Sequence, residues 1–158
     1  MKKLLLAMVT VSVLIFALSG CGVFSKPELG TTWNAKGASI VNTAYSPLSV
    51  RAYSLDVNLE FGGIWDSNKV KTGTVKFGVA STEERVDVGD PEYTVIDGTY
   101  DPSSKLLQLR CEGKGNTSKD SKITLRGTVS DKTTINNGLI YKTSDMDSSI
   151  GTFTVNKQ

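Results

Sequence analysis

Leu55-Asp56-Val57-Asn58-Leu59-Glu60-Phe61 is the stretch that decides the fold. Apolar and polar residues alternate through the whole stretch, which is the two-residue period of a β-strand with one buried and one solvated face. The segments from Val75 to Val79 and from Leu107 to Cys111 repeat the alternation. After residue 20, no window of the chain keeps apolar residues at helical spacing over several turns, so the pattern there predicts strands and no long helix.

Weaker strand patterns and turn signals alternate along the rest of the chain. The weaker strand patterns cover residues 38–45, 47–53, 85–88, 93–96, 122–129, 137–141 and 151–155. Clusters of Gly, Asn, Asp, Ser and Pro, which are typical of turns, stand at 62–63, 66–68, 89–91, 101–104, 113–116, 130–132 and 136–138. Connections this short leave no room for helical crossovers, so the sequence predicts an antiparallel meander of about eight strands.

An all-β sheet of this size has to remove its edges, either by closing into a barrel or by folding into a sandwich. The meander favours a small up-and-down barrel, with a β-sandwich as the alternative. Gly30-Thr31-Thr32-Trp33 at the start of the domain faintly resembles the Gly-x-Trp motif of lipocalin-type and avidin-type barrels, whose tryptophan plugs one end. One extra residue separates Gly30 from Trp33, so the resemblance implies a style of fold and not a family.

A short motif of glycine, threonine and an apolar residue recurs along the predicted strands. It begins at Gly73, Gly98, Gly127 and Gly151, at intervals of 25, 29 and 24 residues. Each interval is about the length of a two-strand unit with its turns. Because glycine and threonine are common in antiparallel strands, we interpret the motif as periodic hairpins and not as homologous repeats.

The N-terminal segment has the order of an export signal. Lys2 and Lys3 supply positive charge, the residues from Leu4 to Leu18 are apolar apart from two hydroxyl side chains, and small residues follow. A transmembrane helix needs about 20 apolar residues, and this run is shorter. The segment therefore predicts a signal peptide at residues 1–20 that is removed after export.

Leu18-Ser19-Gly20-Cys21 closes this segment and closely resembles the lipobox of bacterial lipoproteins. The resemblance implies that a lipoprotein signal peptidase recognises Leu18, Ser19 and Gly20. It also implies that the Cys21 thiol receives a diacylglyceryl group and becomes the mature N-terminus. The alternative is an ordinary secretory signal that ends in a cysteine by chance. Membrane lipid, reached through Cys21, is the partner that this resemblance implies.

The resemblance also predicts where the protein resides. It places the chain in a bacterial cell envelope, lipid-anchored to a membrane. In diderm bacteria, an aspartate directly after the lipidated cysteine resembles an inner-membrane retention signal. Gly22 stands at this position here, so the outer membrane is the expected location in a diderm. In a monoderm, the cell membrane is the expected location.

The chain divides into three predicted parts: a cleaved signal peptide at 1–20, a lipidated N-terminus and short tether at 21–32, and a single β domain at 33–158. The stretch after Cys21 has few large apolar residues and contains Pro27 and Gly30. Eleven flexible residues have a root-mean-square reach of about 18 Å, which would hold the domain close to the bilayer. Packing of this stretch onto the domain as an edge is the alternative.

Composition narrows the chemistry of the mature part. The chain has 18 basic and 16 acidic side chains, and two of the basic ones, Lys2 and Lys3, lie in the signal. The remaining basic residues are scattered singly, so nucleic acid is not an expected partner. Cys111 is the mature thiol that remains beside the lipidated Cys21, so we expect no internal disulfide and a buried cysteine in place of a reactive one.

The absence of histidine removes the commonest general base and most zinc sites, so we expect a domain that is not an enzyme and binds no cofactor or metal. Acidic residues crowd between Glu83 and Glu92, and we interpret them as a solvated loop. Asp145-Met146-Asp147 lacks the ligand count and central glycine of a calcium loop. A hydrolase would need two carboxyl groups that face one cleft at about 5 to 10 Å.

Trp33 and Trp65 are the candidate binding aromatics, because tryptophan combines a wide apolar surface with one hydrogen-bond donor. Packing in the core is the alternative for both. The sequence as a whole predicts an envelope lipoprotein with a non-enzymatic β domain that binds a small molecule, a glycan or a protein. A carboxylate-dependent hydrolase of envelope polymers and a purely structural envelope component are the alternatives.

Overall fold

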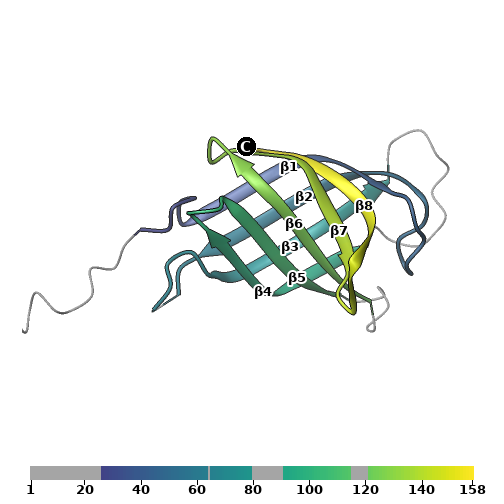
Figure 1. Cartoon of the computed structure of the whole chain (residues 1–158), viewed down its shortest axis with the longest axis horizontal. Helices are drawn as coiled ribbons and strands as arrows, with labels where there is room; N and C mark the ends of the chain where they lie inside the picture. Colours follow the sequence, from purple (N-terminus) through teal and green to yellow (C-terminus); the bar gives the residue numbers. More distant parts are fainter. Residues whose placement is uncertain (1–25, 64, 80–90, 115–120) are drawn as a thin grey trace, which may run out of the picture.

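The fold is a closed β-barrel. The computed structural model describes residues 26–63, 65–79, 91–114 and 121–158. The strands are β1 (Thr32–Val41), β2 (Arg51–Phe61), β3 (Val70–Val79), β4 (Glu92–Asp101), β5 (Leu106–Gly113), β6 (Lys122–Ser130), β7 (Thr134–Lys142) and β8 (Asp145–Lys157). Each strand pairs antiparallel with the next, and β8 pairs with β1, which closes the barrel (Figure 1). The predicted eight-stranded up-and-down meander is confirmed, and the sheet is not a sandwich.

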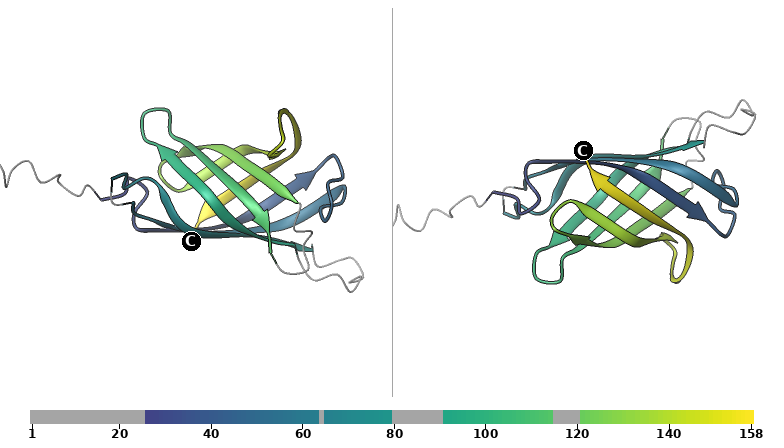
Figure 2. Two further views of the ribbon diagram at one scale, coloured as in Figure 1. Left: turned by 90° about the horizontal axis from the view of Figure 1, so that it is seen from below. Right: turned by 90° about the horizontal axis from the view of Figure 1, so that it is seen from above.

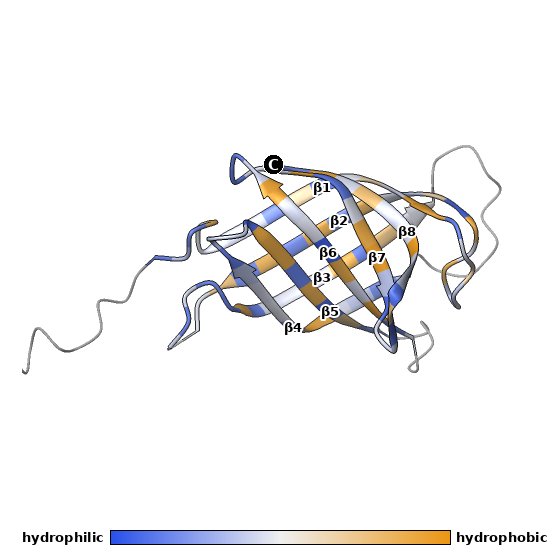
Figure 3. Ribbon diagram, in the orientation of Figure 1, coloured by the Kyte–Doolittle hydropathy of each residue, from blue (hydrophilic) through white to orange (hydrophobic). Residues whose placement is uncertain are grey.

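The alternation that predicted β2 places its apolar side chains inside the barrel. Leu55, Val57 and Leu59 are at most 2% exposed, whereas the polar residues between them lie on the outside. Figure 3 shows the same change between hydrophobic and hydrophilic positions along the other strands. Burial of each such side chain contributes about 1.5 to 3 kcal/mol, so the interior is the main source of stability.

Glycines of the recurring motif make room for large neighbours inside the barrel. A Cβ atom on Gly73 would lie 2.8 Å from Cδ2 of Leu59, and one on Gly98 would lie 2.8 Å from Cγ2 of Val70. A Cβ on Gly127 would overlap the side chain of Ile135. The motif therefore marks positions where a missing side chain is filled by a larger one from an adjacent strand, as in other small barrels.

The closing seam between β1 and β8 depends on two further close approaches. Gly37 pairs with Val155, and Gly151 pairs with Val41. A Cβ atom on Gly37 would overlap the carbonyl oxygen of Thr154, and one on Gly151 would overlap a carbonyl of β1. Because the obstacle is backbone, no side-chain rotation can relieve it. The two ends of the sheet meet only because both positions lack a side chain.

Several predicted boundaries were wrong. The turn expected at 136–138 is a bulge within β7, where Asn137 has φ 55° and the pairing with β8 shifts register between Ile135 and Gly138. Asparagine tolerates this left-handed conformation in bulges as well as in turns, so the signal was ambiguous. The turn between β7 and β8 lies at 143–144 instead. The predicted strand at 85–88 lies outside the described residues.

The connection between β1 and β2 also differs from expectation. The strand expected at 38–45 begins earlier, at Thr32, and ends at Val41, and the one expected at 47–53 begins at Arg51. Residues 42–50 instead fold over the end of the barrel, where the Leu48 side chain is buried in the core. An isolated bridge joins Tyr45 to Leu48. The apolar residues of this segment close the barrel end rather than extend the strands.

The last part of the predicted tether packs against the barrel. Leu29 is buried in the core, and the Lys157 ammonium donates a hydrogen bond to its carbonyl oxygen (3.1 Å). Glu28 forms an ion pair with Lys132 in the turn between β6 and β7. Residues 28 and 29 thus contact the folded domain before the predicted boundary at residue 33. Residues 1–25 lie outside the described residues.

The two ends of the barrel are closed differently. We call the end that is covered by residues 26–31 the tether end. The connection between β2 and β3 lies at the same end, and both views of Figure 2 show it beside residues 26–31. The opposite end, the far end, is covered by residues 42–50. Below them, Phe77 packs edge-on against Tyr53 and Tyr93, with ring centroids 5.7 Å apart in each pair. Burial raises the pKa of Tyr93 to about 12, although its hydrogen bond with Ser121 lowers the pKa.

Cys111 is fully buried on β5, as predicted, and burial raises the pKa of its thiol well above the usual value. Because the thiolate is the reactive form, we expect iodoacetamide to alkylate Cys111 only when the barrel opens. Mass analysis of the peptide that contains Cys111 should show negligible labelling in buffer and complete labelling in denaturant. Rapid labelling of the folded protein would contradict the packing described here.

Candidate functional site

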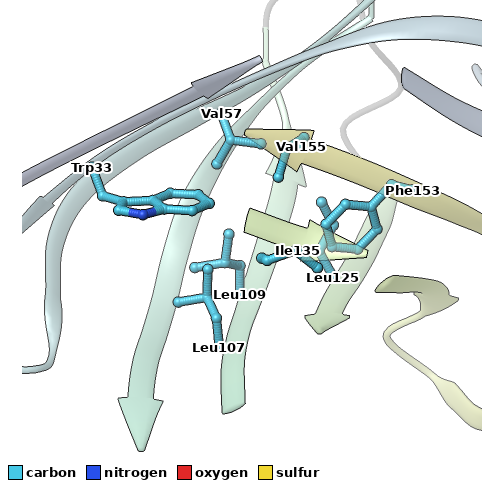
Figure 4. Close-up of a pocket in the computed structure, with 8 residues that line it drawn as sticks. All are labelled: Trp33, Val57, Leu107, Leu109, Leu125, Ile135, Phe153 and Val155. Carbon is cyan, nitrogen blue, oxygen red and sulfur yellow. The ribbon is translucent and has the colours of Figure 1, made fainter. Parts of the chain in front are cut away.

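The barrel interior is filled by side chains around Trp33. A cavity of about 10 Å³ remains there, and Figure 4 shows the eight apolar residues that line it: Trp33, Val57, Leu107, Leu109, Leu125, Ile135, Phe153 and Val155. A water molecule needs about 10 to 15 Å³ and two or more polar partners, so this cavity has no room for an organic ligand.

Trp33, one of the two candidate binding aromatics, is a core residue. Its ring is fully buried, and Nε1 donates a hydrogen bond to the carbonyl oxygen of Lys132 (3.1 Å). The indole therefore fills the tether end of the barrel and fastens the turn between β6 and β7. This is the plugging position that the faint resemblance to lipocalin-type and avidin-type barrels implied.

Trp65 lies at the opposite extreme of exposure. Its side chain is 97% exposed in the connection between β2 and β3, at the tether end. The other predicted site residues, Leu18, Ser19, Gly20 and Cys21, lie outside the described residues. Trp33 and Trp65 thus do not form one binding surface, since one is inside the barrel and the other is in solvent.

A groove of about 600 Å³ crosses the outside of the barrel over β1, β2, β3 and β4, and we call it the outer groove. Its lining residues come from all four strands and from the residue that directly follows β5: Thr32, Asn34, Asn58, Leu59, Glu60, Lys71, Thr72, Gly73, Thr74, Thr94, Val95 and Lys114. Most are the polar, outward-facing members of the alternating patterns. A small hydrophobic floor is formed where Gly73 lies between Leu59 and Val95.

The register of the strands aligns the polar side chains of the outer groove in rows. Asn34 pairs with Asn58, Asn58 with Thr74, and Thr74 with Thr94, which makes one continuous row across four strands. Adjacent strands are about 4.8 Å apart, so the row presents amide and hydroxyl groups at a regular spacing. A second row, offset by two residues along each strand, joins Thr32 to Glu60 and Glu60 to Thr72.

The groove forms where the pairing of β3 with β4 is interrupted. These strands pair at three positions, from Thr74 with Thr94 to Lys76 with Glu92. On the other side of Thr74, the next bridge joins Lys69, which directly precedes β3, to Thr99 of β4. The pairing of β4 with β5 shifts register between Val95 and Asp97, as expected for a bulge that bends the strand. The interruption leaves the polar rows beside a gap in the ladder.

The charges at the outer groove are paired. The Glu60 carboxylate accepts hydrogen bonds from the Lys71 ammonium and the Thr72 hydroxyl, both at 3.3 Å. Lys114 forms an ion pair with Glu92 at 2.8 Å. Such exposed pairs contribute about 0 to 1 kcal/mol each, so their main effect here is to balance the charge of the groove. The ligand that suits this surface is polar and not strongly charged.

Among the described residues, the outer groove does not present the two facing carboxyl groups that a hydrolase would need. Glu60 is the carboxylate among the described residues that line it, and two neighbours already bind that side chain. Most of the acidic stretch between Glu83 and Glu92 lies outside the described residues. In the segment that follows β7, the Asp145 carboxylate accepts hydrogen bonds from the backbone N–H groups of Asp147 and Ser148, so it stabilises a turn.

The described residues include neither a metal-binding cluster nor a membrane-spanning helix. No group of three or more His, Cys, Asp or Glu side chains is placed there to hold a metal ion. No helix in those ranges has the length and apolarity that a membrane crossing requires. Comparison of the chain with protein-family models, curated proteins and solved structures found no match.

The sequence patterns did not predict the outer groove. Its asparagines and threonines are the polar members of alternating strands, and every half-buried strand has such residues. The signal that identifies them is their alignment across β1 to β4, which depends on strand register. Only the pairing of residues distant in the chain reveals it.

Proposed function

We propose that this protein is a lipid-anchored envelope lipoprotein whose barrel binds a glycan on its outer surface, without catalysis. The row of Asn34, Asn58, Thr74 and Thr94 is the observation that carries this proposal. The lipobox-like Leu18-Ser19-Gly20-Cys21 supports the anchor. The class of protein is therefore a small, closed barrel that presents a polar face at the membrane surface.

A glycan fits the outer groove better than the other ligand classes expected from the sequence. Amide and hydroxyl groups both donate and accept hydrogen bonds, as sugar hydroxyl and acetamido groups do. A regular row of such groups suits a polymer that repeats its own polar groups. A small apolar ligand would need an interior cavity, and the space around Trp33 is about 10 Å³. A protein partner would bury more apolar surface than Leu59 and Val95 provide here.

Removal of two hydroxyl groups from the row tests the proposal. We expect Thr74→Ala with Thr94→Ala to weaken binding to envelope glycan by about 5-fold to 100-fold, because each lost hydrogen bond is worth about 0.5 to 1.5 kcal/mol. Binding is measured by co-sedimentation of the purified protein with insoluble glycan from the native envelope. The matched control is Thr128→Ala with Thr152→Ala, which removes two outward-facing hydroxyl groups from β6 and β8.

The control double variant should bind the glycan as the wild type does. Unfolding curves of both double variants separate loss of binding from loss of stability. Equal binding by the wild type and the Thr74, Thr94 variant would contradict the proposed site. Absence of any sedimentation of the wild-type protein with glycan would contradict the proposed ligand class.

A further inference from the structure

Trp65 is barely packed against the rest of the described domain. Its ring is 97% exposed, so the described domain leaves almost all of this large apolar surface in water. Tryptophan is usually well buried in folded proteins, and a fully exposed ring is therefore informative. Indole also carries a polar N–H, which suits a site that is apolar on one side and wet on the other.

The connection that carries Trp65 is held by hydrogen bonds. Its ends are joined by the Gly62 N–H, which donates to the Lys69 carbonyl oxygen (3.0 Å). The Gly63 N–H donates to the Asp66 carbonyl oxygen (2.9 Å), and the Tyr100 N–H of β4 donates to the Asn68 carbonyl oxygen (3.0 Å). The two ends of this connection, at Gly62 and at Asn68, are thus hydrogen-bonded in place. The exposed ring is presented in a defined place.

The same connection contacts the chain that leads to Cys21. The Glu28 N–H donates a hydrogen bond to Oδ1 of Asn68 at 2.8 Å. Lys26 is five positions after Cys21 in the chain, and a chain of this length spans at most about 18 Å. A lipid on Cys21 would therefore keep the tether end within about 18 Å of the bilayer surface. The connection between β2 and β3, to which Trp65 belongs, lies at that end of the barrel (Figure 2).

We propose that Trp65 inserts into the headgroup region of the lipid bilayer and forms a second membrane contact beside the acylated Cys21. This inference rests on the lipid anchor of the proposed function. Tryptophan is enriched at membrane–water interfaces because its amphipathic ring sits at the level of the headgroups. An acyl anchor alone leaves the barrel free to turn about its tether. The second contact orients the tether end toward the bilayer and leaves the far end in solution.

Fluorescence quenching tests this orientation. The acylated protein, purified from membranes, is reconstituted into phosphatidylglycerol and phosphatidylcholine vesicles with and without a spin-labelled lipid that quenches indole. Subtraction of the Trp65→Phe spectrum isolates the emission of Trp65, because Trp33 is the other tryptophan. We expect the Trp65 emission to shift to shorter wavelength on vesicles and most of it to be lost with the quencher. Trp33, buried in the barrel, reports whether the variant is folded.

A second variant places a fluorescent reporter at the far end of the barrel. Met146→Trp combined with Trp65→Phe places an indole at the start of β8, which runs from the far end. Its emission should be unaffected by the quenching lipid. Solvent-like, unquenched emission from Trp65 in a protein of acylated mass would overturn the inference and leave the lipid anchor intact. Unacylated mass of the membrane-purified protein would overturn both proposals.

Discussion

Replacement of Cys21 by serine is expected to abolish lipid attachment and the processing that follows it. A serine hydroxyl cannot form the thioether that the lipobox resemblance implies. The protein should lose all label from a radioactive fatty acid and keep residues 1–20, as intact mass would show. Fatty-acid label is the decisive measurement, since an uncleaved apolar segment can itself hold a precursor at the membrane.

Cys111→Ala is the matched control for this experiment. It removes the other cysteine of the chain, which is buried on β5, and leaves the lipobox-like segment unchanged. The control should be labelled and processed as the wild type is. Two acyl chains hold a protein stably at a membrane, whereas one chain gives marginal binding. A Cys21→Ser protein that is still processed and still carries label would exclude the lipid anchor.

Replacement of Gly37 by alanine is expected to cause the largest loss of stability among single substitutions in the barrel wall. The new Cβ atom would overlap the backbone carbonyl of Thr154, so β1 and β8 would have to separate. Overpacking against movable side chains costs about 1 to 3 kcal/mol, and a fixed backbone obstacle should exceed that range. Since small domains have about 5 to 15 kcal/mol of stability, we expect a large drop in the urea midpoint or failure to fold.

Lys36→Ala is the matched control on the same strand. Lys36 is exposed and pairs with Asp56 on β2 and Asn156 on β8, so its truncation should change the free energy of unfolding by about 0.5 kcal/mol or less. Equal urea midpoints for Gly37→Ala and Lys36→Ala would contradict the close approach at the seam. Unfolding is followed by the fluorescence of Trp33, which passes from the barrel interior to water.

The fold could be predicted because its main signal lies in short stretches of neighbouring residues. Alternation in the stretch from Leu55 to Phe61 depends only on neighbouring residues, and each strand with such a pattern was recognised in some form. Closure followed from a general constraint on sheet edges. The errors arose where one residue type serves two backbone geometries, as at Asn137, or where apolar residues of a connection cover a barrel end, as at Leu48.

The candidate sites also differ in whether a local sequence signal could identify them. The lipobox-like motif at Cys21 is a contiguous signal and needs no fold to be recognised. Trp33 and Trp65 were singled out together by residue type, and the fold then buried one and exposed the other. The outer groove could not be predicted, because Asn34 and Thr94 are far apart in the chain and meet only through the pairing of four strands.

By itself, the amino-acid sequence determined an all-β domain and predicted an export signal before it, because side-chain alternation and a short N-terminal motif are properties of adjacent residues. Only the tertiary structure decided which polar residues share a face, where Gly37 must lack a side chain, and which tryptophan meets solvent. The physical reason is that register and closure are set by packing between distant strands, and these contacts cannot be read from any one strand.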